Sequence, residues 1–229
     1  FYFYAFHYSI KMPQRKCCHF DKQVRFFCQF CSMKYAIITG ASSGFGAATA
    51  KELQNMGYGL VLLARRMERL EALKAALTAT PVYIAQLDVC QEEEVQAVIK
   101  KLPNEIADNI FILVNNAGLA VGRGPLDTGL SEDWNRMLDT NVKGLLYMSH
   151  AVIPLLKKHP FSHLINISSI AGKEVYAGGN VYCASKHAVD ALSKALRIDL
   201  LPHQIKVSNI APGAAETEFS LVRFKGDAQ

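Results

Sequence analysis

The chain has 229 residues, of which 50% are hydrophobic and 20% are charged. This composition excludes a chain that is disordered throughout, which would need low hydrophobicity and a high net charge. The formal net charge of +5 gathers at one end, because residues 1–32 carry five basic side chains and one acidic one, whereas residues 33–229 carry 20 and 19. A nearly neutral body predicts no nucleic-acid partner. The sequence holds no run of about 18 apolar residues, so we expect no membrane partner either.

Residues 1–32 differ in composition from the rest of the chain. They hold 10 of the 22 aromatic residues and show neither a helical nor a strand period. One interpretation is a zinc site without the paired spacing of zinc fingers; its ligands would come from Cys17, Cys18, Cys28, Cys31, His7 and His19. A second is a mitochondrial presequence, although Ser and Arg are sparse. We favour a third, in which Met33 is the true start, residues 1–32 are an unstructured extension, residues 33–229 form one domain, and no metal is bound.

The two cysteines of the body, Cys90 and Cys183, follow no pairing pattern. Disulfides persist in oxidising compartments, so a body without a disulfide pattern indicates a reducing one. We therefore expect a cytoplasmic protein.

From Met33 onward, short apolar runs alternate with helical stretches. The runs are rich in Ile, Val and Leu, as in parallel strands that are covered on both faces. The predicted strands span residues 35–39, 59–64, 82–87, 110–114, 164–167 and 205–210, and the predicted helices span 44–56, 66–78, 91–102, 131–158 and 180–201. Ser131 with two following acids starts the fourth helix, and Pro154 predicts a kink near its end. This order predicts an α/β fold, a Rossmann-type doubly wound parallel sheet with helices on both faces.

A glycine-rich segment connects the first predicted strand to the first helix. Glycines there let the backbone approach a pyrophosphate, and the free N–H groups of the helix N-terminus face it. The residues that we expect at a cofactor are Gly40, Ser42, Ser43, Gly44, Phe45 and Gly46. The spacing is Gly-x-x-x-Gly-x-Gly, which an ordinary glycine-rich turn also satisfies.

The second predicted strand ends at Ala64 and is followed by Arg65 and Arg66. Sites for NAD usually place an acid at this point, where it binds the ribose 2′-hydroxyl. Arginine side chains suit a 2′-phosphate instead, so the pair predicts NADP. A solvated pair of arginines at a helix start is the alternative.

Tyr182 and Lys186 are i,i+4 neighbours on one face of the last predicted helix. A tyrosine has a pKa of about 10, and a nearby cation favours its phenolate form. Lowering that pKa to about 7 needs roughly 4 kcal/mol, which an ammonium and an oxidised nicotinamide ring could supply together in a partly dry site. Tyr-x-x-x-Lys alone is common by chance, so its interpretation depends on the other motifs.

Together these motifs make residues 33–229 resemble the short-chain dehydrogenase/reductase superfamily. In chain order they are Thr39-Gly40-x-x-x-Gly44-x-Gly46, Asp88-Val89, Asn115-Asn116-Ala117-Gly118, Asn141, Ser169, Tyr182-x-x-x-Lys186 and Pro212-Gly213. The resemblance implies an NADP-dependent oxidoreductase that acts on CH–OH groups. It makes residues 33–229 a dinucleotide-binding catalytic domain.

The resemblance also implies roles for single residues. Tyr182 would be the acid/base, Lys186 would bind the nicotinamide ribose and tune Tyr182, Ser169 would bind the reacting oxygen, and Asn141 would hold a water in a proton relay. Ser168 competes with Ser169, but the family's serine precedes the tyrosine by 13 residues, which selects Ser169. The remaining residues implied at the cofactor are Asp88, Val89, Asn115, Ala117, Gly118, Pro212, Gly213, Ala215 and Thr217.

Residues 176–182 and 217–227 resemble the branch of NADP-dependent 3-hydroxy acid dehydrogenases, which act on serine, allo-threonine and related acids. Ser169 and Tyr182 would then bind the substrate hydroxyl, and Arg223 would bind its carboxylate, with Lys225 as the second choice. A general carbonyl or 3-ketoacyl reductase is the nearest alternative.

Relatives continue past Gln229 through another helix and strand, so the family's last strand is expected to be missing. A non-catalytic NADP-binding fragment is the rival from another class, and a homotetramer is expected if that part is present.

Overall fold

Six parallel strands form one sheet in the computed structural model, which describes residues 32–213. The strands are β1 (Tyr35–Thr39), β2 (Gly59–Ala64), β3 (Val82–Gln86), β4 (Ile110–Asn115), β5 (His163–Ile167) and β6 (Lys206–Ile210). Their spatial order is β3-β2-β1-β4-β5-β6. The order reverses between β1 and β4, and at such a switch point the carboxyl ends of the strands leave a crevice for a ligand. The predicted doubly wound parallel sheet is confirmed.

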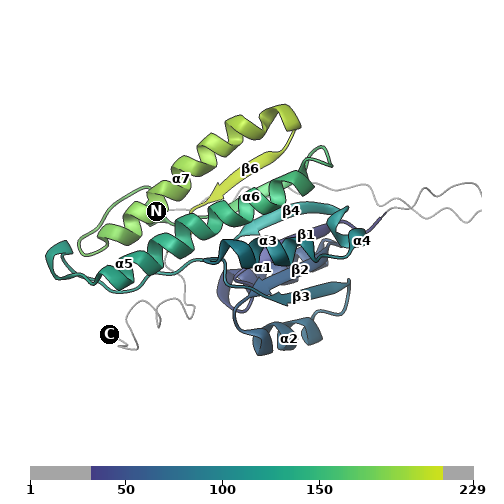
Figure 1. Ribbon diagram of the computed structural model, residues 1–229, viewed down its shortest axis with the longest axis horizontal. Helices are drawn as coiled ribbons and strands as arrows, with labels where there is room; N and C mark the ends of the chain where they lie inside the picture. The colour runs from purple at the N-terminus through teal and green to yellow at the C-terminus, as the bar shows by residue number, and fades with distance from the viewer. Residues whose placement is uncertain (1–31, 214–229) are drawn as a thin grey trace, which may run out of the picture. The chain divides into compact units, whose positions relative to one another are not determined.

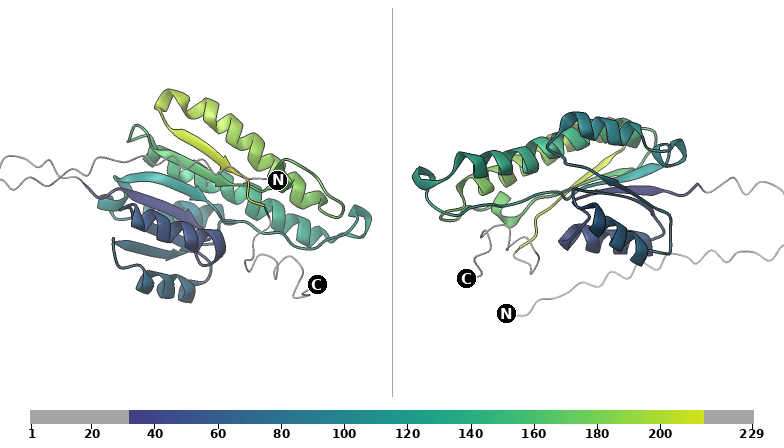
Figure 2. Two further views of the ribbon diagram at one scale, coloured as in Figure 1. Left: turned by 180° about the vertical axis from the view of Figure 1, so that it is seen from behind. Right: turned by 60° about the horizontal axis from the view of Figure 1, so that its bottom comes forward.

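Helices cover both faces of this sheet (Figure 1). On one face lie α1 (Gly44–Asn55) and α2 (Met67–Ala76); on the other lie α3 (Glu92–Lys100), α6 (Gly144–Leu156) and α7 (Asn180–Leu200). Figure 2 shows the two layers when the sheet is seen nearly edge-on. The short helices α4 (Asn104–Ala107) and α5 (Ser131–Leu138) complete the α-helices of the described residues, all of which belong to one unit that begins at Ser32. No helix in residues 32–213 is long and apolar enough to span a membrane.

The core consists of two apolar layers, one on each side of the sheet. Every residue of β1 and of β2 is buried, because both strands lie in the middle of the sheet with helices above and below. Alternate side chains supply the two layers: Val61 packs in the cluster that contains Met148 of α6, whereas Leu62 packs in the cluster that contains Leu70 of α2. Full burial of an aliphatic side chain contributes about 1.5–3 kcal/mol, so these layers hold the strand ends in place.

The predicted helix over residues 131–158 is interrupted. After α5 the chain forms a π-helical segment, Asp139–Lys143, before it continues as α6. Ser131 is the first residue of α5, preceded by Leu130 at the N-cap position, and Pro154 lies inside the last turn of α6. The departure from α-helical geometry therefore lies at the segment that contains Asn141, far from the proline.

Strand β6 forms one edge of the described sheet. The amide of Lys206 donates to Ser162 O and the amide of Ser168 donates to Ile210 O, so the even-numbered residues of β6 face β5. The carbonyl of Val207 points the other way and accepts two hydrogen bonds from the Arg197 guanidinium, at 3.2 and 3.1 Å. An unpaired edge carbonyl is thereby satisfied, and α7 is joined to the strand beside it.

Candidate active site

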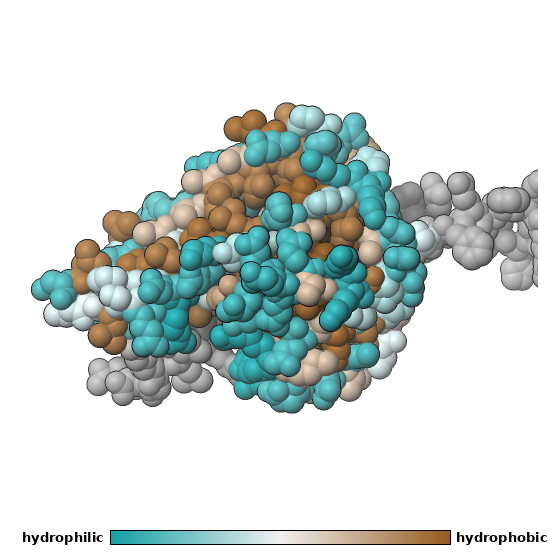
Figure 3. Space-filling model, viewed as in Figure 1, coloured by the Kyte–Doolittle hydropathy of each residue, from teal (hydrophilic) through white to brown (hydrophobic). Residues whose placement is uncertain are grey.

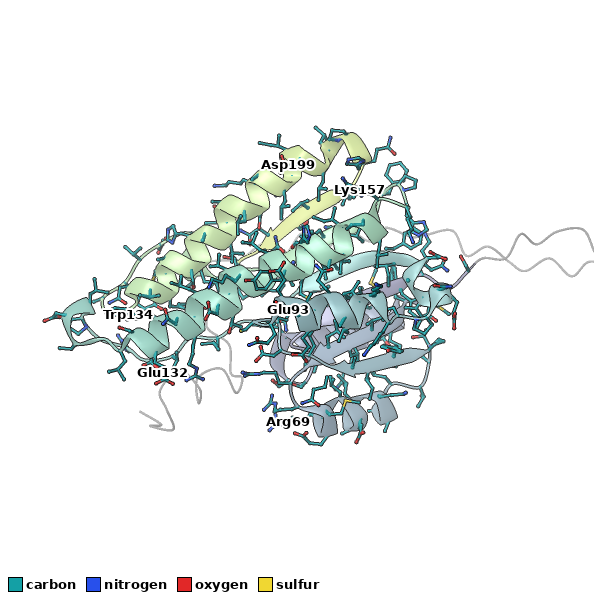
Figure 4. All side chains as sticks on the ribbon, in the orientation of Figure 1. Arg69, Glu93, Glu132, Trp134, Lys157 and Asp199 are labelled. Atoms are coloured by element: carbon teal, nitrogen blue, oxygen red, sulfur yellow. The ribbon has the colours of Figure 1, made fainter. Side chains whose placement is uncertain are left out.

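The motif residues gather at the carboxyl ends of β1, β4 and β5, where the strand order reverses. Tyr182, in the first turn of α7, packs in a cluster with Val121, Met137 and Ala171. Trp134 of α5 packs against the same cluster, and Figure 4 shows this residue near the end of the molecule at which α7 begins. The candidate catalytic residues and the glycine loop therefore share one end of the sheet.

The glycine loop fits a phosphate-bearing ligand. Gly40 has φ +62°, a conformation that other residues rarely adopt, and a Cβ at Gly46 would lie 2.4 Å from Gly40 O. Only glycine at position 46 allows the start of α1 to approach the loop so closely. The first N–H groups of an α-helix have no partner within the helix, so this cradle presents donors to an anion.

Asn116 fastens the glycine loop to the end of β4. Its Nδ2 donates to Thr39 O at 2.9 Å and to Gly40 O at 3.1 Å. In return, Thr39 Oγ1 accepts from the amides of Asn116 and Ala117, both at 3.0 Å. The sequence motif predicts no role for Asn116 by itself. The adjacent asparagines in the Asn115–Gly118 motif were the only available signal, and they do not say which of the two faces the loop.

Asn115 instead points into the interior. Its Nδ2 donates to Ser149 Oγ of α6 and to Asn166 Oδ1 of β5, both at 3.0 Å, and Asn166 donates onward to Ser193 Oγ of α7 at 2.9 Å. These buried bonds join two central strands to two helices. A contact between Asn115 and a cofactor stays a prediction, and with the side chain engaged in this way it would have to come from the backbone.

Of the two arginines after β2, Arg66 lies at the glycine loop. Its Nη2 donates to Ser43 Oγ at 3.0 Å and to Ser42 Oγ at 3.2 Å. Arg65 is exposed, and its carbonyl accepts from Gln86 Nε2 at 3.1 Å. From the sequence we expect Arg65 at a 2′-phosphate with Arg66 assisting; in this structure Arg66 is the one that contacts the loop.

Asp88 and Val89 follow β3 and lead toward the π-helical segment. Asp88 Oδ1 accepts from the amide of Cys90 at 3.0 Å, which closes a tight turn. A Cβ at Gly144 would lie 2.7 Å from Val89 Cγ2, so Val89 packs directly against the start of α6. The Asp88–Val89 segment, which is expected at the cofactor, is therefore braced by the same helix that follows Asn141.

Lys186 is buried at the bottom of the site. It is 5% exposed, and its Nζ donates to Ile167 O at 3.0 Å. Burial lowers the pKa of this ammonium to about 8, because a charged group loses hydration in the interior. A Cβ at Gly118 would lie 3.4 Å from Lys186 Nζ and 3.2 Å from Asn141 Oδ1, so both polar groups converge on this glycine.

Hydrogen bonds to Leu119 and Ser185 hold the Asn141 side chain. Its Oδ1 accepts from the amide of Leu119 and its Nδ2 donates to Leu119 O, both at 2.8 Å, and Nδ2 also donates to Ser185 Oγ at 3.0 Å. The π-helical segment directs this 2% exposed side chain toward α7. π-Helical segments often mark functional sites, which fits the role that the resemblance implies.

Ser169 and Ser168 have different surroundings. Ser168 is 4% exposed and donates to Lys186 O at 3.1 Å, so its side chain faces α7. Ser169 is half-buried and caps the 3₁₀ helix η3 (Ile170–Gly172), where its Oγ accepts from Ala171 N at 3.2 Å. Ile170 N donates to Pro212 O at 3.0 Å, which brings the Pro212–Gly213 segment beside Ser169.

Several expected site residues lie outside residues 32–213. They are Ala215, Thr217 and Arg223, together with the second-choice Lys225. The cysteines and histidines of the alternative zinc site also lie outside this range. Within the described residues, no group of three or more His, Cys, Asp or Glu side chains is arranged to hold a metal ion.

The buried lysine predicts a pH dependence of stability in the protein without ligand. Between pH values of about 8 and 10.5 the unfolded chain holds a proton at Lys186 that the folded protein has released. Stability rises with pH wherever the unfolded state binds more protons, so this residue should make the unfolding free energy increase by about 1 kcal/mol per pH unit. Lys186→Met removes the contribution. Urea unfolding of both proteins between about pH 7.5 and about pH 9.5 measures it, and parallel curves would contradict the assignment.

Comparison with known proteins agrees with this geometry. A family model described as short chain dehydrogenase matches residues 34–226. The chain is 46% identical over 192 residues to the NADP-dependent 3-hydroxy acid dehydrogenase YdfG of Escherichia coli strain K12, and covers 77% of it with 83% of its own length. It is 45% identical over 193 residues to sulfoacetaldehyde reductase 2 of Chromohalobacter salexigens, with 83% of this chain and 76% of that one covered.

Solved structures give the same result. The closed form of a serine dehydrogenase complexed with NADP⁺ superposes with a TM-score of 0.81 at 45% identity, covering 84% of this chain and 77% of that one. An alcohol dehydrogenase from Thermococcus sibiricus, complexed with 5-hydroxy-NADP, has a TM-score of 0.78 at 30% identity, with 83% and 80% covered. The family match spans most of the sequence and the motif residues meet at one end of the sheet, so the chain belongs to the short chain dehydrogenase family.

Proposed function

We propose that the protein is an NADP-dependent oxidoreductase that transfers a hydride between NADP(H) and the C3 hydroxyl or carbonyl of a small 3-hydroxy acid, such as serine, allo-threonine or 3-hydroxyisobutyrate. The observation that carries the proposal is the convergence of a buried ammonium, Lys186, and the Asn141 amide on Gly118, below the helix turn that holds Tyr182. The glycine cradle lies at the same end of the sheet. Membership of the family and the NADP-dependent relatives support the same activity.

Four residues have separate roles in the proposed hydride transfer. Ser169 and Tyr182 bind the oxygen of the reacting carbon, and Tyr182 takes its proton during oxidation or returns it during reduction. Lys186 supplies a positive charge near the phenol, which favours the phenolate because opposite charges attract strongly in a partly dry site. Asn141 holds its segment against Leu119 and, as the resemblance implies, supports a water that exchanges protons with Lys186. The bound NADP(H) accepts or donates the hydride.

Arg66 supports the choice of NADP over NAD. Its guanidinium bonds to the Ser42 and Ser43 hydroxyls of the glycine loop, which supports a contact between Arg66 and the 2′-phosphate of a bound NADP(H). Charge-assisted bonds between arginine and phosphate are strong and directional. Arg65 is the exposed neighbour that we expect to assist.

The substrate class rests on the relatives and on the need for a carboxylate-binding cation. Ser169 and Tyr182 suit a hydroxyl but not an anion, so a 3-hydroxy acid requires a positive charge elsewhere. Arg223, in the segment after Pro212–Gly213, is the candidate. A second cation, Arg123, is exposed and lies against Gly178, four residues before Tyr182.

The remaining parts of the proposal concern the whole protein. We assign the activity to residues 33–229 and regard residues 1–32 as an extension with no part in it.

We also propose a homotetramer. Figure 3 shows apolar side chains over α6 and α7 on one face. Leu146 of α6 and Ile198 of α7 are 40% and 73% exposed, and Leu201, which directly follows α7, is 72% exposed. A cytoplasmic location is proposed because Cys90 and Cys183 follow no pairing pattern.

The cofactor choice predicts the effect of removing either guanidinium. Arg66→Gln and Arg65→Gln should each weaken NADPH binding, by about 10- to 100-fold for Arg66, because a charge-assisted hydrogen bond contributes about 1.5–3 kcal/mol. NADH, which lacks the 2′-phosphate, should bind each variant nearly as before. Fluorescence titration with both cofactors measures this, with Arg136→Gln on α5 as the matched exposed control. If the unmodified protein binds NADH as tightly as NADPH, the assignment is wrong.

Tyr182→Phe tests the proposed chemistry against the reading of a non-catalytic NADP-binding protein. The change keeps the ring and removes the group that transfers the proton. Turnover of the best substrate in a panel of 3-hydroxy acids and ketones should fall by at least about 10²-fold, while the Kd for NADPH should change little. Near-normal turnover would assign the acid/base role to another residue. Tight NADPH binding by the unmodified protein without turnover on any substrate would favour the non-catalytic reading.

The carboxylate contact predicts a selective loss. Arg223→Ala should raise KM for serine or 3-hydroxyisobutyrate by about tenfold or more, because a bond to a charged group is lost. A neutral alcohol of similar size should be affected little. Comparison of kcat/KM for charged and neutral substrates in Arg223→Ala and Arg123→Ala shows which cation is used. A preference of the unmodified protein for the neutral substrate would favour the general carbonyl reductase instead.

A further inference from the structure

One nearly buried carboxylate, that of Asp190 on α7, accepts from three side chains. Lys173 Nζ lies 2.5 Å from Oδ1, Asn209 Nδ2 lies 2.7 Å from Oδ1, and Lys194 Nζ lies 2.8 Å from Oδ2. Asp190 is 9% exposed. The hydrogen bonds from Lys173 and then from Lys194 hold the pKa of this carboxyl well below its usual range, so it stays ionised throughout the working range of pH.

Two of the three donors come from other segments of the active site. Lys173 directly follows η3, the short helix that Ser169 caps. Asn209 lies on β6, three residues before Pro212. Asp190 itself is one helical turn beyond Lys186 on α7. A single carboxylate therefore joins the segment of the candidate catalytic serine, the helix of the candidate tyrosine and lysine, and the strand that leads toward the Pro212–Gly213 segment.

The serine segment has few other anchors on its outer side. Ala171 and Gly172 are buried against α7, but Ile170 is 54% exposed and Val175 is 77% exposed. Apolar burial therefore holds one side of η3 only, and the ion pair to Asp190 closes its far end. A displacement of about 1 Å between reacting groups can reduce a rate by about 10²-fold, so the position of this segment matters to catalysis.

We propose that Asp190 is a positioning residue that sets the Ser169 hydroxyl relative to Tyr182 by holding Lys173 and Asn209. The inference rests on the proposed function, since it assigns Asp190 an effect on that reaction. The positioning role proposed for Asp190 predicts another effect than a salt bridge that only stabilises the fold. The side chains of Lys173 and Lys194 are 50% and 66% exposed, and ion pairs with exposed partners contribute little to stability. The effect lies in geometry and not in global stability.

The two lysines that contact Asp190 allow a matched test. Lys173→Gln removes an ammonium that joins two segments. Lys194→Gln removes the other ammonium that pairs with Asp190, but Lys194 lies on α7 itself, four residues after Asp190. Lys173→Arg keeps the charge and serves as the rescue. Turnover is measured per NADPH-binding site, so that unfolded protein does not count. Thermal unfolding of each variant follows stability separately.

Lys173→Gln should lower kcat by about tenfold or more, an amount that a shift of a fraction of an ångström explains. Lys194→Gln and Lys173→Arg should stay within about twofold of the unmodified protein. The Kd for NADPH should be alike in all four proteins. Equal kcat in Lys173→Gln and Lys194→Gln, or a loss in Lys173→Gln that Lys173→Arg does not recover, would overturn the proposal.

Hydrogen exchange supplies a readout that needs no substrate. Amides of residues 169–176 should exchange faster in Lys173→Gln than in Lys194→Gln, because the segment opens locally when its far anchor is lost. Equal exchange in the two variants would overturn the proposal even if no substrate is found. Absence of turnover in the unmodified protein would instead count against the proposed function, so the two failures are distinguishable.

Discussion

The site depends on the bonds that cross the switch point of the sheet. At this point β1 and β4 send their chains to opposite faces, and a crevice opens between them. The Asn116 amide spans it by donating to two carbonyls at the end of β1, while Thr39 Oγ1 accepts two amides in return. Each such bond contributes about 1 kcal/mol net, but four of them fix the glycine loop relative to Gly118. The glycine loop and the side of the crevice that holds the candidate catalytic residues thus become one rigid unit.

The Lys186 ammonium lies on the other side of Gly118, in a buried position where a charged group is unfavourable. Lys186 is buried among apolar and amide groups with one carbonyl acceptor at 3.0 Å, and its pKa falls to about 8 for that reason. An ammonium in such surroundings gains from any nearby anion. A phenolate at Tyr182 would be such an anion, so the buried ammonium and the acid/base role proposed for the tyrosine would support each other. The buried polar chain of Asn115, Asn166 and Ser193 keeps the strands and helices around it in register.

The sequence predicted the architecture well because its signals are local. The six strands appear where the apolar runs lie, with bounds that differ by at most one residue at either end, and the family expected from the motifs is confirmed. The interruption at Asp139–Lys143 was missed, because a π-helical segment keeps the amphipathic pattern of the helices that flank it. The contacts of Asn116 and Arg66 with the glycine loop were not predicted, because neighbouring residues of the same type differ only in the direction in which they point.

By itself the sequence determined which residue types stand at the ends of which strands, that the first turn needs glycine, and that a tyrosine and a lysine share one helix face. These follow from backbone conformation and from periods of two to four residues. Only the tertiary structure decided that Asn116 faces the loop while Asn115 faces the core, and that Asp190 meets Lys173 and Asn209. Such contacts join residues that lie far apart in the chain, and their geometry is set by how the helices pack on the sheet.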